Sequence, residues 1–180
     1  MKKIILISTA LTAITLLACS KSKAGEDEIN SPKTEVPAHL KGTWMYGNFS
    51  TIEYWSQDPS GYIGNALEFA IAFKFNSDGT FEQYFTSSSV IAGQTTYQQS
   101  VTKGTVVIDE VNKTIITYPA KAHYKRSRGG VTLEERDLAK SEMTGNTTYQ
   151  YSTGTEVNGT NALYLVLQGT NSSLKFLSKN

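Results

Sequence analysis

The chain has 180 residues, 39% of them hydrophobic, and its 17 Lys and Arg nearly balance its 16 Asp and Glu, for a net charge of +1. This near-neutral balance lacks the basic excess with which proteins capture nucleic acid, so no nucleic-acid partner is expected. A single cysteine excludes an intrachain disulfide, so a domain of this length must be stabilised by burial alone.

Residues 1–18 have the pattern of a signal peptide. Lys2 and Lys3 precede a mainly apolar stretch over residues 4–17, which is shorter than the roughly 20 residues of a membrane-spanning helix. Leu16-Leu17-Ala18-Cys19 closes the stretch and resembles the lipobox of bacterial lipoproteins. The resemblance implies cleavage before Cys19, acylation of that residue and anchoring in a membrane. The alternative is an ordinary signal peptide that ends near a chance cysteine.

Residues 19–38 are predicted to form a flexible tether behind the lipidated cysteine. They contain an acidic run, Glu26-Asp27-Glu28, two prolines and only two larger aliphatic side chains. Such a segment buries too little apolar surface to offset its ordering entropy. Ser20, directly after the cysteine, resembles outer-membrane sorting patterns, so we expect an anchor in the outer membrane of the bacterial cell envelope. Residues 39–180 are predicted to form one domain.

Residues 67–75 show the clearest strand pattern. Apolar side chains alternate with small or charged ones and fall on one face: Leu67, Phe69, Ile71, Phe73 and Phe75. Five successive alternations predict a half-buried strand.

A hairpin is predicted directly after this strand. Pairing Phe75 with Phe81 keeps the aromatic side chains on one face and places Lys74 opposite Glu82. Gly79 then takes the left-handed position of the turn, where a Cβ is costly.

Further strands are expected over residues 41–49, 95–108, 114–124, 147–153, 162–168 and 173–177. In the last hairpin, one face of the first strand meets apolar side chains of the second: Leu163, Leu165 and Leu167 face Leu174 and Phe176. About eight strands joined by short turns predict an all-β, antiparallel up-and-down barrel, with a sandwich as the alternative. Within the 126–145 insertion, Thr132-Leu133-Glu134-Glu135 has a capping-box pattern, which favours one short helix there.

Leu40-Lys41-Gly42-Thr43-Trp44 opens the first strand and resembles the Gly-x-Trp signature of lipocalins. The resemblance implies a calycin-like barrel in which Gly42 allows strands to approach closely and Trp44 closes one end. The later part of the chain departs from the family, because it lacks a Thr-Asp-Tyr motif and an Arg on the last strands. The alternative is a strand with an ordinary core tryptophan.

The chemistry-bearing residues do not indicate an enzyme, a metal site or a cofactor. His39 and His123 lack the local spacing of zinc ligands, and no nucleophile elbow or phosphate-binding loop occurs. Glu68 and Glu82 are predicted to be solvated rather than a catalytic pair. Lys121, His123 and Lys125, on one strand face, form a basic cluster that either meets an anionic ligand or lipid headgroup or is simply a polar rim.

Aromatic residues in the long 51–65 connection are the candidate ligand site. Tyr54, Trp55 and Tyr62 lie in a loop, where aromatic side chains often serve recognition. We therefore expect a barrel that binds a small apolar or amphipathic ligand at a mouth shaped by this loop. The alternative is a protein-protein interaction module of the cell envelope with a filled barrel.

Overall fold

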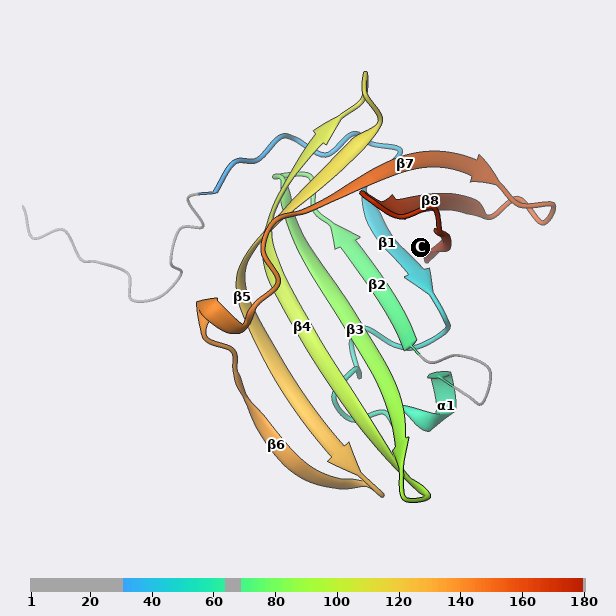
Figure 1. The fold of residues 1–180 in the computed structure, drawn as a ribbon. Helices are drawn as coiled ribbons and strands as arrows, with labels where there is room; N and C mark the ends of the chain where they lie inside the picture. The colour runs from blue at the N-terminus through green and yellow to red at the C-terminus, as the bar shows by residue number, and fades with distance from the viewer. Residues whose placement is uncertain (1–30, 64–68, 180) are drawn as a thin grey trace, which may run out of the picture.

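The computed structural model describes residues 31–63 and 69–179, which form one antiparallel sheet closed into a barrel (Figure 1). Eight strands make the ring, and each pairs with the next one along it: β1 (Gly42–Tyr46), β2 (Phe69–Phe75), β3 (Thr80–Ile91), β4 (Gln94–Asp109), β5 (Thr114–Arg128), β7 (Thr147–Thr155), β8 (Asn161–Leu167) and β9 (Ser173–Lys179). The ring closes where β9 pairs with β1. The predicted up-and-down barrel is therefore confirmed.

Several predictions lie outside the described residues. These are the signal peptide, the lipobox with Cys19, residues 19–30 of the tether, and Leu67 and Glu68 at the start of the predicted second strand. Among residues 31–63 and 69–179, no helix has the length and apolar character needed to cross a membrane.

The predicted β2–β3 hairpin has the expected register. Phe75 pairs with Phe81, and Lys74 lies opposite Glu82. Gly79 has a φ of 81°, in the left-handed region that favours glycine. Local alternation and turn chemistry together were sufficient to fix this pairing, because its two strands are separated by only a few residues.

Residues 32–38 are packed against the barrel, so the predicted tether is wrong for this segment. The amide of Thr34 donates to the carbonyl of Val106 at 3.0 Å, and the amide of Ile108 donates to Oγ1 of Thr34 at 2.9 Å. Val36 and Leu40 are buried, 4% and 0% exposed, in the main core. These few apolar side chains pack onto the main core, a contact that composition does not reveal. The domain therefore begins near residue 32.

The Gly79→Val variant is expected to unfold at a clearly lower denaturant concentration than the wild type. A Cβ at Gly79 would lie 2.4 Å from the carbonyl oxygen of Thr34, and the positive φ adds strain. The combined cost is about 2–3 kcal/mol in free energy of unfolding. Urea unfolding checks this, with Gly159→Val as control, since Gly159 also has a positive φ but has open space around it. Equal losses in both variants would show that packing against Thr34 contributes nothing.

The closed end of the barrel is filled by aromatic side chains from the inner faces of the strands. Phe73 stacks on Phe75 with ring centroids 5.7 Å apart and contacts Phe176 at 5.6 Å. Trp44 is buried among them, and its Nε1 donates to the carbonyl of Leu40 at 2.7 Å. The buried polar edge of the indole thus has a partner, as is usual for buried polar groups.

Gly42 does not have the packing role that was expected of it. A Cβ at this position would have no heavy atom within 4 Å, so no close approach of strands depends on the missing side chain. Its φ of 112° is the feature that favours glycine, since L-residues rarely adopt it.

The outer face of β2 is buried as well, which corrects the prediction of a half-buried strand. Ala70 and Ala72 are both 0% exposed, because residues 47–63, including the short helix α1 (Ser60–Ile63), fold over the outside of β2, β3 and β4. This forms a second core, separate from the barrel interior.

The 126–145 insertion is a strand rather than the expected helix. β6 (Val131–Asp137) pairs with residues 123–128 of β5, and only one 3₁₀ turn, η1 (Lys140–Glu142), follows it. The reason is that β7 pairs only with residues 114–117 of β5, which leaves the far edge of a long strand without backbone partners. Residues 131–137 supply those backbone hydrogen bonds as strand β6, and this pairing stabilises the segment more than the local helix preference of the capping-box pattern does. β3 to β6 therefore extend beyond the ring as a curved sheet (Figure 1).

Candidate functional site

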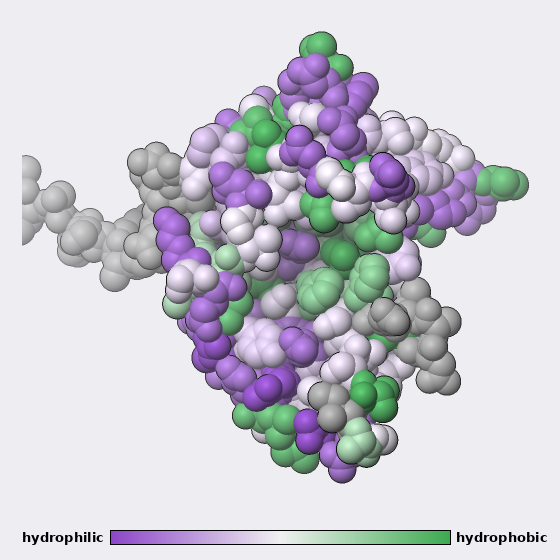
Figure 2. Space-filling view, in the orientation of Figure 1, coloured by the Kyte–Doolittle hydropathy of each residue, from purple (hydrophilic) through white to green (hydrophobic). Residues whose placement is uncertain are grey.

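Two adjoining cavities lie inside the barrel, between its aromatic closed end and the opposite end. Phe73 and Phe176 bound the first cavity on the side of the closed end. The first has a volume of about 270 Å³ and is mainly apolar; it is lined by Phe69, Ile71, Phe73, Tyr149, Leu165, Leu167, Thr170, Ser172, Leu174 and Phe176. The second has a volume of about 380 Å³, and Tyr149 and Leu167 line both. Figure 2 looks onto this side of the molecule, where the surface is recessed and hydrophobic side chains are visible within the recess.

The apolar cavity is built by strand alternation. β2 contributes Phe69, Ile71 and Phe73 from its inner face, and β8 and β9 pair so that Leu165 lies opposite Leu174. The predicted meeting of these last-hairpin side chains is confirmed. Among the described residues, no carboxylate or amine side chain lines this cavity, so its chemistry suits a hydrocarbon group.

The second cavity combines hydroxyl and amide groups with apolar ones. Polar side chains come from β3, β4, β5 and β7: Gln83, Ser100, Thr102, Thr117 and Thr147. Tyr149 stands between the two cavities with its ring 5.8 Å from that of Phe73. Burial raises the pKa of the Tyr149 phenol, so the hydroxyl stays protonated and can donate a hydrogen bond. The pair of cavities is thus apolar at one side and hydrogen-bonding at the other.

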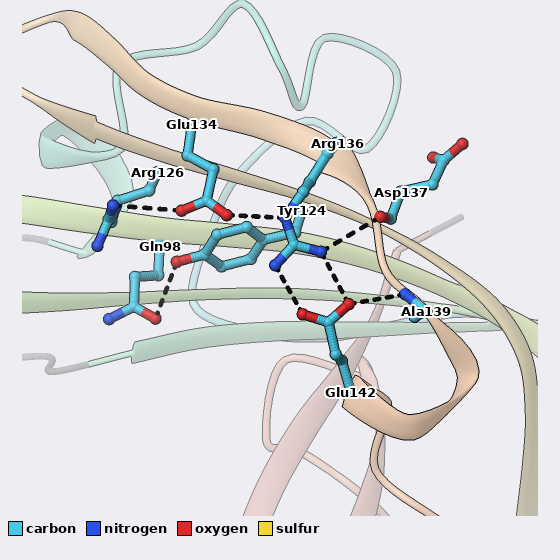
Figure 3. A network of polar contacts seen from close by, with 8 residues as sticks. All are labelled: Gln98, Tyr124, Arg126, Glu134, Arg136, Asp137, Ala139 and Glu142. Atoms are coloured by element: carbon cyan, nitrogen blue, oxygen red, sulfur yellow. Dashed lines mark hydrogen bonds and ion pairs between the residues drawn. The ribbon is translucent and has the colours of Figure 1, made fainter.

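A charged network fixes one wall of the second cavity (Figure 3). The guanidinium of Arg136 donates to both carboxylate oxygens of Glu142, at 2.7 and 2.8 Å, and to Glu134 at 2.8 Å. The amide of Ala139 donates to the same Glu142 carboxylate at 2.9 Å. The hydrogen bonds from Arg136 lower the pKa of Glu142 to about 2. The carboxylate therefore stays ionised at physiological pH, and residues 139–142 stay attached to β6.

The aromatic residues expected at the mouth lie on the outside of the barrel. Tyr54 and Tyr62 are buried in the second core, and both hydroxyls hydrogen-bond to Thr86, at 2.8 and 3.2 Å. Trp55 packs edge-on against Tyr54 with centroids 4.9 Å apart and lines two outer grooves. The structure thus brings the three aromatics together, but in the packing of the 47–63 loop, because the outer face of β2–β4 offers apolar surface to cover.

The basic cluster also lies on the outer face, as its alternation predicts. Lys121 and His123 line one outer groove, and Lys125 lines another. Nδ1 of His123 is 2.8 Å from a carboxylate oxygen of Asp137. Of the two glutamates considered as a pair, Glu82 instead accepts a hydrogen bond from Tyr84 at 2.6 Å and lies 3.5 Å from Lys103.

The polar residues of the interior are the ones that sequence reasoning missed. Thr102 and Thr117 alternate along their strands just as solvent-facing residues do, so nothing local distinguishes the two cases. Gln83 had a local signal, because it lies between Phe81 and Phe85 on the face that alternation predicts to point inward. The inward direction of Tyr149 could have been predicted, since it alternates with Tyr151 in a predicted strand.

Comparisons with models of protein families, with curated proteins and with solved structures found no match to this chain. Within residues 31–63 and 69–179, no group of three His, Cys, Asp or Glu side chains is placed to hold a metal ion.

Proposed function

We propose that this chain is a membrane-anchored lipoprotein of the bacterial cell envelope whose lipocalin-like barrel binds a small apolar or amphipathic molecule without catalysing a reaction. The observation that carries the binding function is the apolar cavity of about 270 Å³, which joins a more polar one of about 380 Å³. Small barrels either fill with side chains or hold one small ligand. An unfilled, mostly apolar interior with a hydrogen-bonding side supports the second case.

The position of the N-terminal segment supports access from the aqueous side. Val36 and Leu40 pack at the closed end of the barrel, so the segment that would connect the domain to an anchor joins the barrel there. The cavities lie toward the opposite end and would face away from the anchoring membrane. The alternative function, a docking module with a filled barrel, receives less support, because the interior is not filled.

The Leu174→Trp variant is expected to weaken ligand binding strongly while the barrel stays folded. Leu174 is half-buried and lines the apolar cavity, so a larger side chain occupies the space of the ligand. The measurement is the fluorescence of N-phenyl-1-naphthylamine, a neutral apolar probe, with a loss of affinity of about tenfold or more expected. Val111→Trp is the control, since Val111 is 91% exposed on a turn.

Mass spectrometry of the gently purified full chain should reveal a co-purified apolar or amphipathic molecule, absent from Leu174→Trp. Equal probe binding by wild type, Leu174→Trp and Val111→Trp would refute binding inside the barrel.

The Cys19→Ser variant is expected to move from the membrane fraction to the soluble fraction or to remain uncleaved. Each acyl methylene buried in the membrane contributes about 0.8 kcal/mol to binding, so one acyl chain binds a protein to the membrane weakly, whereas two or three anchor it stably. Cell fractionation and electrophoretic mobility measure this, with Ser22→Ala as control. Ser20 and its resemblance to sorting patterns support the outer membrane. If Cys19→Ser fractionated and were processed like the wild type, the proposed lipid anchor at Cys19 would be refuted.

A further inference from the structure

The barrel wall has a gap along one edge of β5. β7 pairs with residues 114–117 of this strand and β6 pairs with residues 123–128. No strand of the described part of the chain pairs with the stretch between them on that side. Pro119 lies in this stretch and has no amide hydrogen to donate. Across the gap, among the described residues, the amide of Leu138 donates to the carbonyl of Ala122 at 2.8 Å.

Cavities lie on both sides of this gap and share lining residues there. An outer groove of about 470 Å³ runs between the 51–55 loop and the segment that follows β6. Ala122, Leu138 and Met143 line this groove and also line the interior cavity of about 380 Å³. All three are apolar, so the part of the wall that separates the two cavities suits contact with a hydrocarbon chain.

The outer groove is positively charged. Among the described residues, Lys103, Lys121, Lys140 and His123 line it with one carboxylate, Asp137. The carboxylate of Glu135 also lies 3.5 Å from His123. Lys103 lies 3.5 Å from Glu82, and His123 lies 2.8 Å from Asp137.

Two of these lysines are free to meet an anion. Within the described residues neither Lys121 nor Lys140 forms an ion pair, and both are exposed. The interior cavities offer no free cation among the described residues: the one charged side chain in their lining, Glu142, is a carboxylate already bound by Arg136. An anionic group is therefore favoured outside the wall and disfavoured inside it.

We propose that the ligand is a monomeric anionic amphiphile, with its acyl or alkyl chain in the barrel interior and its acidic headgroup in the outer groove beside Lys121 and Lys140. The chain passes through the wall at Ala122, Leu138 and Met143. This inference rests on the proposed ligand-binding function and names the class of ligand that it takes.

Calorimetry with three probes of equal chain length tests the ligand class: decanoate, decan-1-ol and decyltrimethylammonium, each titrated as monomer into the full chain. Decanoate is expected to bind about tenfold more tightly than decan-1-ol, and the cation most weakly. Lys121→Gln and Lys140→Gln each weaken decanoate binding by about threefold and leave decan-1-ol unchanged. Lys41→Gln, which removes an exposed charge at the closed end, leaves all three affinities unchanged. Added salt weakens decanoate binding only.

The Met143→Trp variant tests the route through the wall. Met143 is half-buried on the segment after η1, so a larger side chain fills the passage without disturbing the strands. We expect the preference for decanoate over decan-1-ol to disappear; a preference that survives would overturn the route.

Failure of this inference is distinguishable from failure of the proposed function. Equal binding of all three probes, unaffected by the lysine variants, overturns the anionic ligand class but leaves ligand binding intact. If none of the three probes binds and the fluorescence of N-phenyl-1-naphthylamine does not change, both the anionic ligand class and the proposed ligand-binding function are overturned.

Discussion

Replacing Gly104 by alanine is expected to destabilise the barrel by about 3 kcal/mol, among the largest effects of a single methyl group in this chain. A Cβ at Gly104 would lie 2.0 Å from the carbonyl oxygen of Tyr118 and 2.9 Å from Cε1 of Phe81. The first is backbone of the neighbouring strand β5, and the second belongs to a fully buried ring. Neither can move without disturbing the ring of strands or its core, so the clash is not relieved cheaply.

The free energy of unfolding in urea measures this loss, and Gly145→Ala is the matched control. Gly145 has open space around its Cα and no positive φ, so the same added methyl group costs less than about 0.5 kcal/mol there. A Gly104→Ala protein with the unfolding midpoint of the wild type would mean that the β4–β5 bulge at residues 103 and 104 is looser than its geometry indicates.

Truncating Tyr54 to alanine is expected to cost about 3–5 kcal/mol and to release the 47–63 loop from the outer face. Tyr54 is 1% exposed and contacts the rings of Phe49, Trp55 and Tyr84. Its hydroxyl bonds to Thr86 at 2.8 Å and donates to the carbonyl of Phe85. Loss of the ring removes the centre of the second core.

Two further variants separate packing from hydrogen bonding in this core. Tyr54→Phe keeps the ring and should cost only about 1–2 kcal/mol, the price of leaving partners unpaired. Ile52→Ala, in the same loop but 96% exposed, should be neutral. Urea unfolding and limited proteolysis within residues 47–63 are the measurements. Similar losses for Tyr54→Ala and Ile52→Ala would show that the loop is not anchored through Tyr54.

The inner wall of the site was predictable because strand alternation is local. Phe73 and Phe75 on β2, and Leu165 on β8, carry their inward direction in the period-two pattern, since successive side chains point to opposite faces. The β2–β3 register was equally accessible, because Gly79 and the Phe75–Phe81 pair are close in sequence. The same pattern could not show that Thr102 and Thr117 point inward, since polar side chains alternate identically on a solvated face.

The all-β fold and its apolar interior could be predicted from local residue patterns, because side-chain direction along a strand depends only on neighbouring residues. The other features arise only from contacts between distant segments. It covered the outside of β2 with Tyr54 and Tyr62, drew Val36 and Leu40 onto the closed end, and turned residues 131–137 into a strand. It also left the gap beside Pro119, where β7 departs from β5 before β6 joins it. Each of these features depends on which distant segment offers unpaired backbone groups or uncovered apolar surface, and that is settled only when the barrel closes.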